Sequence, residues 1–129
     1  MGHKFSPSEL ALYRAVDEVL HYVWDPIGVS SSPYARDEYR GYLPEVYAML
    51  KNNWDANSIA NCLFRMATET MGLTGNREHH LNSARVLLEW KTFFDKFQAD
   101  ANRFVEVDQP SQRQVSAEEV RSQFKGELN

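Results

Sequence analysis

The sequence contains a single cysteine, Cys62, among 129 residues. One thiol excludes an intramolecular disulfide framework and suits a reducing compartment. The longest apolar runs are far shorter than the roughly 20 residues that a helix needs to span a bilayer. The opening residues Met1–Lys4 lack the apolar stretch of a secretory signal. These absences predict a cytoplasmic protein that does not enter a membrane.

Positive charge and glycine are also scarce. Fourteen Lys and Arg residues stand against 18 Asp and Glu, for a net charge of −4. Nucleic-acid binding requires a basic stripe that neutralises phosphates, and none is visible, so we expect no nucleic-acid partner. The six glycines form no phosphate-binding loop. The mild acidity is compatible with a basic protein partner.

What the chain does contain is helical periodicity. Residues Ser6–Glu9 form a capping box with a proline in the first turn, and apolar residues then recur at three- and four-residue steps up to Trp24. The helix should stop there, because Asp25 precedes a proline and so disfavours the α region. Asp25, Pro26 and Gly28 then occupy favoured positions of a type I turn.

Three more helices are predicted after this turn. The second begins after a Ser32 cap, and its apolar stripe continues through Pro44, which predicts a kinked helix. The third begins at an Asp55 cap and ends before Gly72, which suits the left-handed position after a helix. The fourth begins after Asn76 and continues to about residue 104.

The composition changes near residue 109, where polar and charged residues become dominant. We therefore expect a helical domain over residues 1–108 and a tail over 109–129. Val120 and Phe124 offer the tail a thin apolar edge, so it is either a short C-terminal helix or a mobile tail. Few apolar residues there can dock, so folding should not require the tail from about Ser111 onward. The predicted fold is an all-α bundle of four main helices, with the kinked second helix against the first and fourth.

The three tryptophans make this packing scheme specific. Trp24 and Trp90 lie on predicted apolar stripes and should be core residues. Trp54, which follows two asparagines in a loop, should be partly exposed.

The most suggestive surface candidates are acidic and tyrosine residues of the first turn and the second helix. The predicted partner-binding residues are Asp25, Asp37, Glu38, Tyr42 and Glu45. Tyrosine supplies large contact area, and carboxylates attract a basic partner. Two structural interpretations remain open: Asp25 accepts N–H bonds of its own turn, and the other charges form a solvated helix face.

Catalytic and metal-binding patterns are weak. His79 and His80 are adjacent, so on a helix they point about 100° apart and cannot bind one ion from the same face. No Glu-x-x-His motif of a di-iron bundle occurs, and Cys62 falls on an apolar stripe, as a buried thiol does. We expect no catalytic residue, no metal and no cofactor. A small metal-dependent enzyme that uses carboxylates and histidine remains an alternative.

Several strings resemble a family of small, uncharacterised all-helical bacterial proteins, and the resemblance covers about Leu12 to Trp90. These proteins share a Trp-Asp-Pro-Ile-Gly turn after the first helix and a Met-Gly-Leu turn before the last. The matching strings are Trp24–Val29, Arg36–Tyr39 with Tyr42–Pro44, Met71–Leu73, and Ala84, Leu87, Leu88 and Trp90. The sequence departs from the pattern at Ser30–Ser32. The resemblance implies an immunity-type protein that binds a basic secreted toxin domain, and a structural or regulatory helical oligomer is a further alternative.

Overall fold

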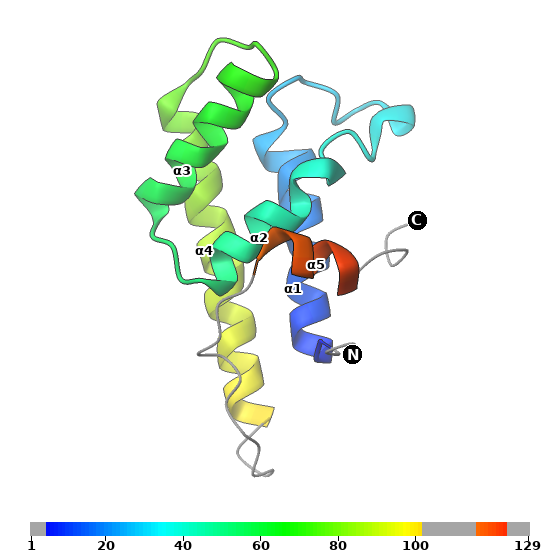
Figure 1. Ribbon diagram of the computed structural model, residues 1–129, viewed down its shortest axis with the longest axis vertical. Helices are drawn as coiled ribbons and strands as arrows, with labels where there is room; N and C mark the ends of the chain where they lie inside the picture. Colours follow the sequence, from blue (N-terminus) through cyan, green and yellow to red (C-terminus); the bar gives the residue numbers. More distant parts are fainter. Residues whose placement is uncertain (1–4, 102–115, 124–129) are drawn as a thin grey trace.

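The computed structural model describes residues 5–101 and 116–123. The described part is all-α, with four main helices and a short C-terminal helix, as the sequence predicted (Figure 1). The helices are α1 (Pro7–Val19), α2 (Leu43–Lys51), α3 (Ala56–Arg65), α4 (Arg77–Ala101) and α5 (Ala117–Gln123). None of the described helices is both long enough and apolar enough to cross a bilayer.

The start and the end of the first helix follow from local chemistry. The Ser6 hydroxyl accepts a hydrogen bond from the Glu9 N–H, and the Glu9 carboxylate accepts one from the Ser6 N–H, at 3.1 and 2.7 Å. Helix α1 then widens into a π-helical turn, Leu20–Trp24. It ends at Asp25, whose backbone is left-handed with φ +34°. The predicted cap and the predicted end are both confirmed.

The second helix is bent by 25°, as predicted, but its regular part is shorter than predicted. Residues Pro33–Ala35 and Arg40–Tyr42 form isolated 3-10 turns, and α-helix begins at Leu43. Pro44 therefore lies in the first turn of α2, where its missing N–H removes no intrahelical bond.

The caps of the third and fourth helices are as predicted. The Asp55 carboxylate accepts from the Ser58 N–H at 2.8 Å, and the Asn76 side chain accepts from the His79 N–H at 3.2 Å. A second π-helical turn, Met66–Thr70, extends α3, and Gly72 follows with φ +73°. The described part of α4 ends at Ala101, so its predicted extension to residue 104 lies outside the described residues.

The core is formed where α4 packs against α1 and α3 while α2 packs against α1, α4 and α5. Its largest fully buried side chains include Trp24, Tyr39, Tyr47, Leu50 and Leu87. The C-terminal end of α4 extends beyond the rest of the bundle (Figure 1). The bundle thus has a compact end, where the turns gather, and an end where α4 projects.

Two expectations about packing are wrong. Trp24 is fully buried and Trp54 is 39% exposed, as predicted, but Trp90 is 40% exposed. Trp90 lies about 60° around the helix from the buried Leu87, which places it at the side of the core-facing stripe. Val120 of α5 is fully buried in the same core, although few apolar residues of the tail were expected to dock. Phe124 lies outside the described residues.

Candidate functional site

The turn after α1 is built around the carboxylate of Asp25. Its Oδ1 accepts hydrogen bonds from the N–H groups of Gly28 and Val29, at 3.1 and 2.8 Å, and from the Tyr39 hydroxyl at 2.7 Å. Its Oδ2 accepts from the N–H of Ser30 at 3.1 Å. Burial opposes ionisation, but the hydrogen bonds outweigh it and hold the pKa of Asp25 below its ordinary value. Asp25 thus stabilises its own turn, as the structural interpretation proposed.

Tyr39 links this turn to the segment before α2. Its phenol oxygen donates to Asp25 and accepts from the Ile27 N–H at 2.9 Å. Burial raises the pKa of Tyr39, and the hydrogen bond to the Asp25 carboxylate raises it further. The residue is therefore a neutral anchor with two hydrogen bonds. From the sequence, Tyr39 was expected on the stripe of the second helix, next to the candidate acidic residues Asp37 and Glu38.

Trp24 connects the same turn to the start of α4. Its indole N–H donates to Nδ1 of His80 at 2.9 Å, and its carbonyl oxygen lies 2.5 Å from Nε2 of His79. A carbonyl can only accept, so His79 carries a proton on Nε2. Burial lowers the pKa of His80, and the neighbouring His79 lowers it further. Both histidines considered for a metal site therefore bind Trp24. Among residues 5–101 and 116–123, no group of three metal-ligating side chains is found.

The arginines that precede α2 point inward. Arg36 makes a 2.9 Å ion pair with Asp17, a buried carboxylate of α1, and a 3.1 Å ion pair with the exposed Glu18. Arg40 approaches Asp17 at 3.4 Å. The positive charges of this segment are thus neutralised by α1, and they hold the 3-10 turns against it.

The five predicted partner-binding residues differ in exposure and in their contacts. Asp37 and Glu38 are neighbours and exposed. Tyr42 is half-buried, with its ring edge-on to Trp24 at 6.2 Å between centroids. Glu45 is exposed on the first turn of α2. Asp25, as described, is engaged in its turn. Within residues 5–101 and 116–123, Asp37, Glu38 and Glu45 are exposed carboxylates without an ion pair, and Asp37 and Glu38 are adjacent.

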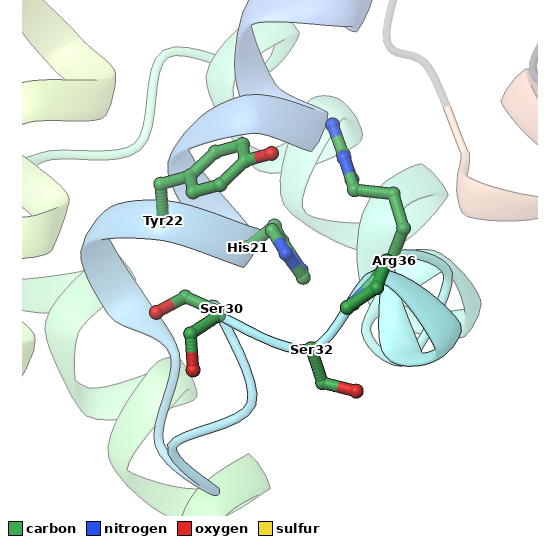
Figure 2. Close-up of a pocket in the computed structure, with 7 residues that line it drawn as sticks. His21, Tyr22, Ser30, Ser32 and Arg36 are labelled. Carbon is green, nitrogen blue, oxygen red and sulfur yellow. The ribbon is translucent and has the colours of Figure 1, made fainter.

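A pocket of about 400 Å³ opens between the end of α1 and the serine loop that follows the turn (Figure 2). It is lined by His21, Tyr22, Ser30, Ser31, Ser32, Pro33 and Arg36. His21 is 2% exposed, and its Nδ1 has no hydrogen-bond partner in the described part of the chain. Sequence reasoning missed this pocket. The available signal was a histidine inside the apolar stripe of α1, beside a run of three serines.

Exposed aromatic side chains follow one side of α4. Phe93 and Phe97 are 56% and 58% exposed, and they continue the side that begins with Trp90. Helical periodicity alone assigns Phe97 to the apolar pattern of this helix, together with Leu87 and Phe94. Because aromatic side chains fit a core stripe and an interface stripe equally well, periodicity alone could not separate the two.

No match is found when the chain is compared with family models, with curated proteins and with solved structures. The resemblance to small helical bacterial proteins therefore stays a prediction. What the described residues offer is an exposed pair of carboxylates on a well-anchored turn, a small polar pocket beside it, and an aromatic strip on α4. The first can attract a cationic group, and the third can bury apolar area against another helix.

Proposed function

We propose that this chain is a protein-binding module, and within that class an immunity-type protein that binds and neutralises a basic bacterial toxin domain. The acidic pair of Asp37 and Glu38 forms the centre of the proposed contact surface. The resemblance in the sequence suggests the biological role, and the exposure of Asp37 and Glu38 supports the choice of surface.

The observation that supports the proposal is that the positive side chains before α2 are paired with α1, whereas the negative ones are exposed. Arg36 and Arg40 are bound by Asp17 of α1, while Asp37 and Glu38 face outward. A segment with charges of both signs in the sequence therefore presents mainly negative charge to solvent. Such a surface steers a basic partner during diffusion and accelerates its association.

The backbone under these carboxylates is fixed, which matters for affinity. Tyr39 follows them directly and is held by Asp25 and by the Ile27 N–H. Arg36 precedes them and is held by its ion pairs to α1. A surface anchored on both sides loses little conformational entropy on binding, so more of the contact energy remains as affinity.

The direct test uses the purified chain and a purified basic toxin domain encoded beside it. Replacing Asp37→Lys and Glu38→Lys together should leave folding intact, because exposed charges contribute less than about 0.5 kcal/mol to stability. The association rate should fall by about tenfold or more at low salt, and the difference should shrink as salt screens the charges. Stopped-flow or surface-binding kinetics at several ionic strengths would measure this.

A matched control reverses two exposed carboxylates elsewhere, Glu69→Lys and Glu78→Lys. The net charge of this variant equals that of the test variant, so a general charge effect would appear in both. If the Asp37/Glu38 variant associates with the toxin domain and neutralises it as well as the parent chain, this surface is not the contact. If the parent chain does not bind the domain at all, the immunity function itself is wrong for that pair.

A further inference from the structure

The C-terminal half of α4 carries an aromatic strip formed by Trp90, Phe93 and Phe97. The three side chains are 40%, 56% and 58% exposed. They are spaced by three and four residues, so each lies about one turn beyond the last on the same side of the helix. The rings of Trp90 and Phe93 meet edge to face, with 5.9 Å between centroids. Single exposed apolar residues are ordinary, but a contiguous aromatic strip on a helix marks an interaction surface.

The strip lies on the C-terminal half of α4 (Arg77–Ala101). One side of this half is covered by the start of α1, where the Ser6 hydroxyl donates to the Gln98 side chain at 3.3 Å. The aromatic strip faces another side, where it stays exposed. A second helix can therefore lie along the strip without displacing α1.

The charges beside the strip have a distinctive order. Glu89 and Lys96 are both exposed and are seven residues apart, so they lie on the same flank of the strip, about two turns from each other. Across the described residues, neither makes an ion pair, whereas Lys91 pairs with Asp95 at 2.5 Å. The flank is thus acidic at its N-terminal end, at Glu89, and basic at its C-terminal end, at Lys96.

We propose that the strip is the interface of an antiparallel homodimer, in which α4 lies against α4 of a second copy of this chain. In a two-fold symmetric antiparallel pair centred on Phe93 and Phe94, equal flanks face each other. Glu89 then comes level with Lys96 of the second copy to within about 3 Å along the axis, and symmetry repeats the pair.

The charge order favours this occupant over a parallel arrangement. In a parallel pair this flank would face the opposite flank of the second copy, so Glu89 and Lys96 would not meet each other. Antiparallel pairing with a second copy brings Glu89 of each copy beside Lys96 of the other, and the same contact buries the aromatic strip. The proposal goes beyond toxin binding, because it uses a different surface from Asp37 and Glu38.

The experiment is sedimentation of the full chain across a wide concentration range, with the wild type and four variants. The wild type should dimerise reversibly. Phe93→Glu places a charge at the centre of the strip and should leave a monomer with an unchanged far-UV spectrum. Lys96→Glu should weaken dimerisation by about tenfold, because each of two symmetric surface pairs contributes up to ~1 kcal/mol. The double variant Glu89→Lys with Lys96→Glu should restore it.

The matched control is Glu78→Lys, an exposed charge reversal on the first turn of α4. It should leave the dimer dissociation constant unchanged. A wild type that stays monomeric at every concentration overturns the proposal, and so does a dimer that Phe93→Glu leaves intact. A double variant no better than Lys96→Glu overturns the antiparallel register. These outcomes do not depend on any toxin domain, so they are separate from the test of the proposed function.

Discussion

Asp25 has its greatest effect on the turn it begins. Its carboxylate accepts three backbone N–H groups and one phenol, and its own backbone is left-handed. Alanine in its place would lose these charge-assisted bonds and would adopt a strained backbone.

We therefore expect Asp25→Ala to lower the free energy of unfolding by about 2–4 kcal/mol. Urea denaturation followed by circular dichroism would measure it. Asp37→Ala, an exposed neighbour on the acidic surface, is the control and should change stability by less than about 0.5 kcal/mol. Equal losses for the two variants would show that the Asp25 hydrogen bonds do not hold the turn.

His80 should make stability depend on pH. Its pKa is lowered from the ordinary value of 6.5 in the folded chain, first by burial and then by His79. The unfolded chain therefore binds a proton at a higher pH than the folded chain does. The stabilising contribution is present above pH 6.5 and is lost as the pH falls toward the folded pKa. Protonation would also cost the Trp24 bond, since Nδ1 could no longer accept.

Unfolding measured at neutral pH and again near pH 5 should show the parent chain losing stability. His80→Gln keeps an acceptor but cannot titrate, so its loss over the same interval should be smaller. If both chains lose the same amount, His80 does not cause the acid sensitivity.

At the scale of the elements, α5 contributes to the core, although the polar composition of the tail gave little indication of it. Val120 is fully buried and packs in the core with residues of α1 to α4. Two methyl groups removed from a closed core cost their transfer energy and leave a cavity.

Val120→Ala should thus destabilise the chain by about 1–3 kcal/mol, and a chain that ends at Gln109 should melt several degrees lower. Differential scanning calorimetry would report both. Ser122→Ala on the exposed side of α5 is the control, with little expected change. Unchanged melting of the truncated chain would show that α5 contributes nothing to the bundle.

The elements also show which features a sequence can predict. Helix starts were predicted correctly at Ser6, Asp55 and Asn76, because a cap involves residues three positions apart. The shorter second helix was missed for a long-range reason. Arg36 binds Asp17, 19 positions earlier, and holds the chain in 3-10 turns that local periodicity cannot reveal.

Some features of the candidate site also follow from the local sequence, whereas others depend on tertiary packing. Asp25 as a turn residue follows from the Asp-Pro pair, and the exposure of Asp37 and Glu38 follows from their charge. The pocket at His21 depends on how the serine loop returns to α1. The exposure of Trp90 depends on which side of α4 meets the bundle. Both are tertiary facts that no motif in the chain records.

For the whole molecule, the two proposed contact surfaces are well separated. The segment with Asp37 and Glu38 lies near the end of α1, and the aromatic strip lies on the half of α4 at the opposite end (Figure 1). A homodimer through α4 would leave both acidic pairs free. Such a dimer could bind two partner domains at once, which raises the apparent affinity for a multivalent target.

The described helices share one core, so the whole molecule should unfold in a single step. Trp24 lies in that core, whereas Trp54 and Trp90 are partly exposed. A chain with Trp54→Phe and Trp90→Phe would therefore report the environment of Trp24 alone. At a concentration where the chain is monomeric, its fluorescence and its helical circular dichroism should give the same urea midpoint. A second transition, with helical signal lost before Trp24 is exposed, would show that α5 or the projecting half of α4 unfolds independently of the bundle.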